Sequence, residues 1–376
     1  MGIRGIPARY GGFETFAEGL ATRLAKRGHD VTVYGRSNII DRKLRYYQGV
    51  RIMVLPTISH KYLDTVIHTL LCSFHSLGAG YDVVLICNAA NSIFSPLPRL
   101  VRQRVVVNVD GIERLRKKWN CAGKIYYRLG EYLATRLPDA IVADAEVIRR
   151  YYLETYRRDS VMIPYGTTLD RTETTEALER FGLAPEGYVL YVSRLEPENN
   201  AHVVVEAFKC VRTDLKLVIV GDAPYAKSYK RQLRGLAADD PRIIFTGFVF
   251  DRGYRELQSH AYCYVQATEV GGTHPALIEA MAAGNMVLAN GTPENIEVLG
   301  DSGLIYQRND VRDLGDKLRF VLEHQEMRKQ YGAKARERAQ ERYSWEAVVV
   351  RYERLFEQLR RPESLRRNTG RAAERP

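Results

Sequence analysis

The alternation of short apolar runs with longer amphipathic segments, which occurs twice along the chain, most constrains the fold. In the first half, the continuous apolar run Asp82–Cys87 indicates a buried strand, and Leu63–Leu77 indicates a helix with one apolar face. In the second half, Tyr188–Val192 and Leu215–Val220 are predicted strands separated by the predicted helix Ala201–Val211. Strands that alternate with helices form parallel sheets covered on both faces. The sequence therefore predicts two α/β domains, each doubly wound.

Domain boundaries follow from where this alternation stops and restarts. A chain of 376 residues can bury two cores of ordinary size. We predict a first domain over residues 1–165 and a second over residues 166–343, joined by the linker IPYGTT. Residues 344–359 are predicted to form a closing helix. Residues 360–376 are rich in arginine and lack periodicity, which predicts disorder.

The start of the chain resembles the second part of a βαβ unit. Gly2–Pro7 indicates a loop, Ala8–Arg27 an amphipathic helix, and the segment after it a strand. The first strand of such a unit is expected upstream of Gly2 and is missing from the sequence. That strand is central in a Rossmann-like sheet, so its loss would uncover strand edges. We therefore expect that the start codon has been placed too late.

Composition indicates a globular protein of the cytoplasm. The chain is 45% hydrophobic and 27% charged. No apolar run is long enough to span a bilayer, and the first residues lack the apolar core of a signal peptide. Five cysteines without C-x-x-C spacing indicate reduced thiols, and the eight histidines show no metal-binding pattern. We therefore expect neither a metal nor a cofactor.

The positive charge is confined to the first half of the chain. Residues 1–165 contain 25 Lys and Arg against 14 Asp and Glu, whereas the remainder contains 31 of each. Such a surface suits nucleic acid, an anionic membrane or a phosphorylated substrate, and it also occurs on merely soluble proteins. The basic half contains no helix-turn-helix, RRM or zinc pattern, which makes a nucleic-acid-binding protein the least favoured class.

The segment Thr268–Gly284 is the strongest candidate for a phosphate site. Its loop contains Gly271 and Gly272, and Thr273 or His274 can then cap a helix. The free N–H groups and the positive dipole end of such a helix favour a phosphate, and the glycines let a ligand approach the backbone. A capped core helix without a ligand remains an equal alternative.

The same segment resembles the nucleotide-sugar signature of the GT-B glycosyltransferases of family 4. The match is LIEAMAAGNMV, where Glu279 takes the place of the second glutamate of the family motif. By resemblance, Glu279 hydrogen-bonds the ribose hydroxyls of the donor. The opening RGIPARYGGFET at Arg4–Thr15 is similar to a subgroup of bacterial rhamnosyltransferases of polysaccharide and capsule assembly. Two matches in the right order are far more specific than either alone.

The resemblance implies a fold and a reaction. The fold is GT-B, in which two Rossmann-like domains face a central cleft and a closing helix crosses back to the first domain. The reaction is retaining transfer of a hexosyl group, L-rhamnosyl from dTDP-L-rhamnose in this subgroup, with UDP- and GDP-hexoses as alternatives. The acceptor is a glycan or a polyprenyl-diphosphate-linked glycan. A catalytically impaired homologue that only binds sugar nucleotides stays open, because Asn199 and Gly271 replace a lysine and a glutamate of the family.

The resemblance also implies site residues. Arg194 matches the diphosphate-binding arginine, and Asp110, at the end of a predicted strand, orients the acceptor hydroxyl or accepts its proton. A surface arginine and a strand-end turn former are the respective alternatives. With Glu279, these form the predicted catalytic set. The predicted donor-binding residues are Gly11, Gly12, Arg194, Asn199, Gly221, Asp222, Phe248, Val249, Gly271, Gly272, Thr273, His274 and Glu279, and the predicted acceptor-binding residues are Arg4, Asn88, Asp110 and Glu113.

A basic cluster with an aromatic residue follows Asp110. It consists of Arg116, Lys117, Lys118, Trp119 and Lys124. An interfacial helix that attracts anionic lipid headgroups has this composition, although a solvated face is the commoner meaning of such a run. Because related enzymes extend lipid-linked glycans at the cytoplasmic leaflet, the resemblance favours a peripheral protein at the inner face of the plasma membrane.

Overall fold

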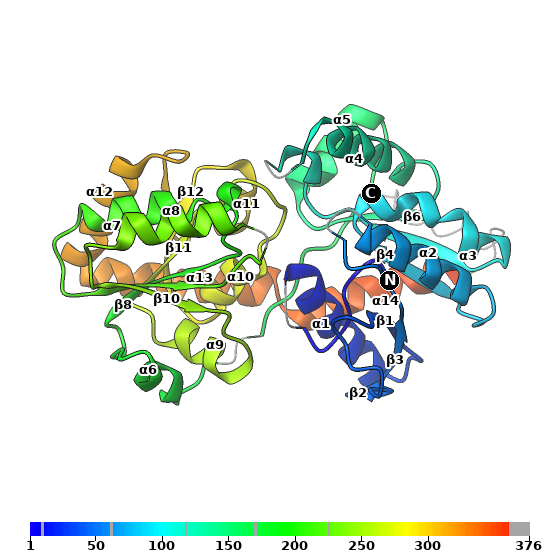
Figure 1. Ribbon diagram of the computed structural model, residues 1–376, viewed down its shortest axis with the longest axis horizontal. Helices are drawn as coiled ribbons and strands as arrows, with labels where there is room; N and C mark the ends of the chain where they lie inside the picture. The colour runs from blue at the N-terminus through cyan, green and yellow to red at the C-terminus, as the bar shows by residue number, and fades with distance from the viewer. Residues whose placement is uncertain (9–10, 61–62, 117–118, 169–170, 225, 361–376) are drawn as a thin grey trace, which may run out of the picture. The chain divides into compact units, whose positions relative to one another are not determined.

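The computed structural model describes residues 1–8, 11–60, 63–116, 119–168, 171–224 and 226–360. The chain divides into two compact units (Figure 1). The first unit contains residues 1–114, residues 119–164 and the segment that starts at Trp345. The second contains Tyr165–Ser344 and also Leu115 and Arg116, which leave the surrounding chain to join it.

The second unit is built on one parallel sheet of six strands. They lie in the order β10-β9-β8-β11-β12-β13, which is the 3-2-1-4-5-6 order of a Rossmann fold. Continuous apolar runs form these strands because helices cover both faces of the sheet. The strands are β8 (Tyr188–Val192), β9 (Lys216–Val220), β10 (Ile243–Gly247), β11 (Cys263–Gln266), β12 (Met286–Asn290) and β13 (Leu304–Tyr306).

Helices cover both faces of this sheet. One face packs on α7, α8 and α12 through a core that includes Val189, Phe208 and Leu314. The helices α9, α10 and α13 lie on the other face (Figure 1). The helical segments are α6 (Glu176–Arg180), η3 (Pro197–Asn199), α7 (Ala201–Lys209), α8 (Lys227–Ala237), α9 (Asp251–Ser259), α10 (Pro275–Ala282), α11 (Pro293–Leu299), α12 (Val311–Glu323) and α13 (Gln325–Arg342).

The first unit contains two sheets. Strands β4 to β7 form a parallel sheet in the order β4-β5-β6-β7, and β1 pairs with β3 in parallel in a smaller sheet that ends at β2. The strands are β1 (Thr32–Arg36), β2 (Tyr46–Tyr47), β3 (Val50–Leu55), β4 (Val83–Cys87), β5 (Arg104–Asn108), β6 (Ala140–Ala143) and β7 (Val161–Met162).

The first residues of the chain lie between these two sheets. The amino group of Met1 donates to the carbonyl of Leu85 at 2.7 Å, and Cys87 N–H donates to the carbonyl of Met1. Three residues after Met1, the carbonyl of Arg4 accepts a hydrogen bond from Arg36 N–H at 2.9 Å. Among the described residues, no strand joins β1 to β4. Residues 1–4 therefore bridge the two sheets by main-chain hydrogen bonds, two between Met1 and β4 and one between Arg4 and β1.

The helices of the first unit begin and end where capping permits. The sequence predicts a helix from Lys124, but α4 begins at Cys121, because the side chain of Asn120 accepts a hydrogen bond from Gly123 N–H and caps it. The helical segments are α1 (Gly12–Lys26), α2 (Asp64–Ser76), η1 (Ala89–Phe94), α3 (Pro96–Leu100), η2 (Glu113–Leu115), α4 (Cys121–Ala134), α5 (Glu146–Tyr156) and α14 (Trp345–Arg360). Leu115, the last residue of η2, joins the second unit.

Helix α14 packs on α1 within the first unit. A Cβ atom on Gly19 would lie 2.1 Å from the Trp345 ring, so only glycine admits this contact. Tyr352 packs on Phe16 with ring centroids 5.5 Å apart. Glu353 accepts hydrogen bonds from Arg27 and His29. The predicted disordered tail, residues 360–376, lies outside the described residues except for Arg360, which ends the helix.

Candidate functional site

The sheet of the second unit has one topological switch point. Its strand order reverses between β8 and β11, which are parallel neighbours. In open α/β sheets, ligands bind outside the carboxyl ends of the strands at such a point. The loop with Arg194 follows β8, and the loop with Gly271 and Gly272 follows β11. Two predicted donor-binding segments, 75 or more residues apart in sequence, therefore meet at one edge of the sheet.

The Arg194 loop is held by backbone contacts. Gly221 has a φ of +124°, and a Cβ atom there would lie 2.0 Å from the carbonyl oxygen of Ser193, so only glycine lets these two loops approach. The side chain of Asn199 donates to the carbonyl oxygen of Arg194 at 2.7 Å. Arg194 itself is half-buried, and its guanidinium has no carboxylate partner among the described residues. The site therefore contains a cation to which the described residues supply no counter-charge.

The glycine loop is shaped around His274. This residue is the N-cap of α10, with Pro275 in the first turn. A Cβ atom on Gly271 would lie 2.3 Å from the His274 ring. The ring bonds the Thr268 hydroxyl at 3.1 Å. Burial, followed by the charges of Arg116 and Arg194, lowers the pKa of His274 to about 3, so its imidazole stays neutral.

Glu279 is half-buried on α10 and has a protein partner. Tyr254 on α9 donates its hydroxyl to Glu279 Oε2 at 2.6 Å, and Gln258 donates to the same hydroxyl oxygen. Burial raises the pKa of Glu279 to about 7, against the opposing effect of the Tyr254 hydrogen bond. The sequence predicts that this carboxylate needs a partner but does not identify Tyr254, because no spacing rule joins residues of separate helices.

An asparagine network that sequence reasoning missed supports the glycine loop. Asn200 and Asn290 both donate to the carbonyl of Ala267 and to the side chain of Asn309. Asn309 also donates to Glu269. Asn290 ends β12, whereas Asn200 follows β8 and Asn309 follows β13. The only sign of this network in the sequence is that an asparagine occurs at or after the carboxyl end of each of these strands.

Other predicted donor contacts lie at the same edge. Asp222 accepts from Lys230 at 2.6 Å and from Ala223 N–H. Phe248 is 37% exposed after β10 and stacks on Phe250, with centroids 5.6 Å apart and an interplanar angle of 19°. An exposed aromatic pair offers a face to a nucleobase. The remaining predicted residues here are Val249 beside this pair, Gly272 in the loop, and Thr273, which is buried.

The first unit contains the other predicted residues. Gly11 is the N-cap of α1, which begins at Gly12, and its carbonyl accepts from Glu14 N–H. The carboxylate of Glu14 is buried and accepts from Arg4 N–H at 3.0 Å. The first turn of α1 therefore fixes the backbone at Arg4.

Asp110 and Asn88 lie at the carboxyl ends of the neighbouring parallel strands β5 and β4. Asn88 uses its side-chain oxygen to cap η1 by accepting from Ala90 N–H. Asp110 is half-buried with a φ of +51°, a backbone conformation that L-residues rarely adopt and that clusters at functional sites. Its N–H donates to Asn108 Oδ1 at 3.1 Å. Glu113 opens η2, three residues further on.

Asn108 links this loop to the last helix. Its side chain is fully buried and donates to the Tyr352 hydroxyl of α14 at 2.9 Å while it accepts from Asp110 N–H. Neither Asn108 nor Tyr352 was expected at the site. Their sequence separation of 244 residues leaves no local pattern that could have indicated them.

The basic cluster is not a continuous surface. Arg116 was expected on a membrane face but is only 7% exposed, because it lies in the second unit beside Glu198. Trp119 is half-buried and packs on Tyr127, and Lys124 is exposed on α4. Lys117 and Lys118 lie outside the described residues. The surface expectation is therefore wrong for Arg116, since a charge run on a sequence cannot show which member turns inward.

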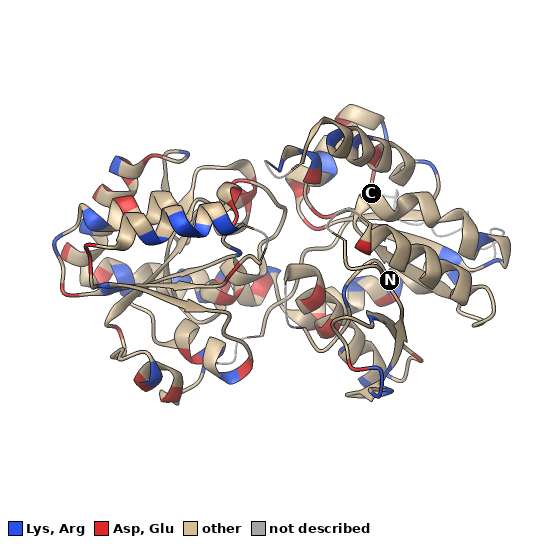
Figure 2. Cartoon of the chain, in the orientation of Figure 1, with Lys and Arg blue, Asp and Glu red and all other residues tan. Residues whose placement is uncertain are grey.

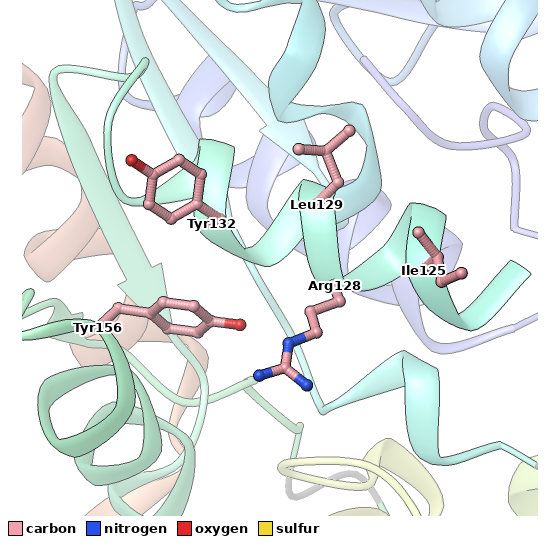
Figure 3. A pocket seen from close by; sticks show the side chains of 5 residues that line it. All are labelled: Ile125, Arg128, Leu129, Tyr132 and Tyr156. Atoms are coloured by element: carbon pink, nitrogen blue, oxygen red, sulfur yellow. The ribbon is translucent and has the colours of Figure 1, made fainter. Parts of the chain in front are cut away.

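Next to this cluster, α4 and α5 form an exposed apolar groove of about 360 Å³. Figure 3 shows Ile125, Leu129 and Tyr132 along one side of α4, with the Arg128 guanidinium reaching toward Tyr156. Ile125 is 70% exposed. The buried carboxylate of Glu131, also on α4, accepts hydrogen bonds from the hydroxyls of Tyr151 and Tyr156 and from Arg114.

The described residues contain neither a metal-binding cluster nor a membrane-spanning helix. No group of three or more His, Cys, Asp or Glu side chains among them could hold a metal ion. None of the helices formed by the described residues is long and apolar enough to cross a membrane.

Two family models match the chain, one in each half. Residues 10–171 match the model described as Glycosyltransferase Family 4, and residues 175–338 match the model described as Glycosyl transferases group 1.

Curated relatives support the same family at low identity. The phosphatidyl-myo-inositol mannosyltransferase of Mycobacterium leprae is 30% identical over 57% of this chain and 58% of its own length. The lipopolysaccharide 1,2-N-acetylglucosaminetransferase of Salmonella typhimurium is 26% identical over 66% of this chain and 71% of its own length. The chain spans about half to three fifths of the length of the first curated relatives it matches.

Solved structures share the fold. Sucrose-phosphate synthase from Thermosynechococcus elongatus superposes with a TM-score of 0.80 at 18% identity, over 94% of this chain and 96% of that one. Anabaena HepE in complex with UDP-glucose gives a TM-score of 0.76 at 15% identity, over 93% and 96%. At these identities, the similarity shows the two-domain GT-B fold alone.

Proposed function

We propose a specific reaction for this chain, which is a glycosyltransferase of the GT-B, family 4 type. It transfers a hexosyl group, with retention of the anomeric configuration, from a nucleoside-diphosphate sugar to a glycan or lipid-linked glycan of the bacterial cell surface. The observation that carries the proposal is the switch point of the second unit. There, Arg194 has no carboxylate partner among the described residues, and the glycine loop opens helix α10.

The donor site can be assigned residue by residue. Arg194 and the N-terminal N–H groups of α10 stabilise charge on the departing diphosphate, while Gly271 and Gly272 let it approach the backbone. Glu279 accepts hydrogen bonds from the ribose hydroxyls, and the exposed Phe248 faces the base. Asn199 contributes indirectly, because its amide is bound to the carbonyl of Arg194.

The transfer step needs few protein groups. The acceptor oxygen forms a bond to the anomeric carbon on the same face from which the diphosphate oxygen departs. The acceptor proton passes to the departing diphosphate or to Asp110, whose strained conformation presents it at the end of β5. Arg4, Asn88 and Glu113 complete the acceptor side. We propose no metal and no cofactor in this step.

For the donor, dTDP-L-rhamnose is our first choice. It rests on the segment Arg4–Thr15 and on the loop VGGTHP, which resemble the rhamnosyltransferase subgroup. UDP- and GDP-hexoses are the alternatives, and the HepE structure of similar fold contains UDP-glucose.

For the acceptor, we propose a polyprenyl-diphosphate-linked glycan at the inner face of the plasma membrane. The apolar groove of α4 and α5, with Lys124 and Arg128 exposed beside it, supports a peripheral contact with anionic lipid. The mannosyltransferase relative acts, by its name, on phosphatidyl-myo-inositol.

A second candidate is a homologue that binds sugar nucleotides but transfers poorly. Asn199 stands where the family has a cation, and its side-chain amide donates a hydrogen bond to the Arg194 carbonyl. Gly271 leaves no room for the glutamate of the family motif, because the His274 ring occupies that space.

A thermal-shift panel of sugar nucleotides followed by a transfer assay tests the proposal. Binding to the folded protein raises its melting temperature. We expect Arg194→Ala to reduce transfer by about a hundredfold or more while the unliganded melting temperature stays unchanged. Arg231→Ala removes an exposed arginine of α8 and should leave transfer unchanged.

Three outcomes are informative. Near-normal transfer by Arg194→Ala contradicts the proposed site. Donor binding without transfer by the wild type supports the impaired homologue. No stabilisation by any sugar nucleotide refutes both candidates.

A further inference from the structure

We propose that Arg116 is a second phosphate-binding cation of the donor site, in the place that Asn199 leaves without a charge. The inference rests on the proposed function, because it assumes that a nucleoside diphosphate binds beside Arg194. From the sequence, Arg116 is predicted to lie on a membrane-facing surface. In the structure, it lies in the second unit beside Glu198, at the edge of the sheet where we propose that the donor binds, which we call the donor edge.

The first observation is where Arg116 lies. It belongs to the second unit by its contacts, although Arg114 belongs to the first. Its Nη1 is 3.8 Å from Oε1 of Glu198, the residue immediately before Asn199. Both Arg116 and Glu198 are buried. The guanidinium is therefore anchored beside the loop that follows β8.

The second observation is that Arg116 and Arg194 act on the same histidine. After burial, the charges of these two residues are the causes that lower the pKa of His274, the N-cap of α10. Both guanidiniums are thus close enough to the start of α10 to influence it. Two guanidinium groups and the positive end of a helix form a site for a doubly charged anion, and arginine binds phosphate oxygens in a bidentate way.

The third observation concerns Asn199. Its side chain is buried and donates to the carbonyl oxygen of Arg194, so it holds the loop in shape. A neutral amide in that role cannot balance a second phosphate charge. Arg116 supplies the missing charge from a different segment of the chain.

Glu198 explains how such a cation is kept in place. Its carboxylate is fully buried, and neither oxygen accepts a hydrogen bond from the described residues. A separation of 3.8 Å is an ion pair without a hydrogen bond. Burying a carboxylate costs free energy unless a charge compensates it. Glu198 therefore attracts Arg116 by charge and not by a hydrogen bond, and an arriving diphosphate competes for the same guanidinium.

The test measures affinity for UDP, dTDP and GDP by calorimetry, beside the matching nucleosides. Arg116→Gln removes the positive charge. It should lower the affinity for the three diphosphates about ten- to a hundredfold, because a hydrogen bond to a charged group is lost. Nucleoside affinity should stay within about twofold, since a nucleoside has no phosphate. Arg231→Gln removes an exposed arginine of α8 and is the matched control, with unchanged affinities.

Two further variants separate binding from folding. Arg116→Gln leaves Glu198 buried and unpaired, so the double variant Arg116→Gln, Glu198→Gln removes both charges and should fold with the same loss of diphosphate affinity. Glu198→Gln alone removes the competing carboxylate. It should bind the diphosphates at least about threefold more tightly and the nucleosides equally.

The outcomes are distinguishable. A folded double variant that binds diphosphates like the wild type overturns the role of Arg116 and leaves the proposed function standing. If the double variant fails to fold, Glu198→Gln decides, and unchanged diphosphate affinity then overturns the inference. A wild type that binds none of the three diphosphates refutes the proposed function and this inference with it.

Discussion

At the scale of single residues, the donor edge contains two titratable groups, Glu279 with a raised pKa and His274 with a lowered pKa. Burial raises the pKa of Glu279 to about 7, so this carboxyl group is only partly ionised at physiological pH, whereas burial and the charges of two arginines keep His274 neutral. Of these two groups, Glu279 is therefore the one that changes its charge close to pH 7.

This difference predicts how nucleoside affinity depends on pH. As the pH rises through about 7, Glu279 loses its proton and becomes a stronger acceptor for ribose hydroxyls, so affinity should rise. Below that pH, the protonated group accepts more weakly. Isothermal titration with thymidine or uridine at several pH values checks this.

Glu279→Gln is the control for this dependence. It should bind nucleosides weakly at every pH and lose the rise near pH 7. A rise of the same size in the variant would show that another group titrates.

At the scale of elements, α14 is an integral part of the first unit. It contacts α1 through Trp345 and Tyr352, and through Asn108 it reaches the loop of Asp110. The sequence indicates a helix here from its apolar periodicity, but not which residues it meets.

We expect Tyr352→Phe to lower the free energy of unfolding by about 1–3 kcal/mol, because the buried amide of Asn108 loses an acceptor. Urea denaturation measures this. Tyr46→Phe removes a hydroxyl from a side chain that is 64% exposed, and should change stability by less than about 0.5 kcal/mol. Equal effects of the two substitutions would contradict a structural role of this hydrogen bond.

The groove of α4 and α5 leads to a second prediction at this scale, which concerns binding to lipid vesicles. Leu129→Glu places a charge among its exposed apolar side chains and should abolish co-sedimentation with phosphatidylglycerol vesicles. Phe74→Glu makes the same change on α2, where Phe74 is 53% exposed, and should leave binding intact. If both variants bind as the wild type does, the groove is not the membrane contact.

At the scale of the whole molecule, charge is divided by sequence half. Residues 1–165 contain the entire net charge of +11, while the rest is balanced. The balanced half still has basic residues along α8, as Figure 2 shows. Net charge alone therefore does not locate a binding face.

We expect vesicle binding to weaken as salt is raised from 0.1 M to about 0.5 M, because exposed charges are screened beyond a Debye length of ~10 Å at the lower salt. Binding of phosphatidylcholine vesicles should be weak at both salt concentrations. Binding to anionic vesicles that does not change with salt would show that apolar contact, without charge, carries the association.

The sequence predicts the fold well and the site unevenly. The strand–helix alternation predicts both Rossmann-like units, since hydrophobic periodicity is a local property. The helix start at Cys121 was missed because the cap Asn120 lies in a charged loop. The partners Tyr254 of Glu279 and Tyr352 of Asn108 come from distant segments, and the burial of Arg116 depends on packing that no local pattern contains.

The place of α14 in the first unit has a consequence for the order in which the protein can mature. A ribosome delivers residues 1–164 long before Trp345, the residue that covers Gly19 and Phe16. Until then, this side of α1 faces the solvent or a chaperone. Helix α1 is therefore synthesised well before the helix that completes its surface.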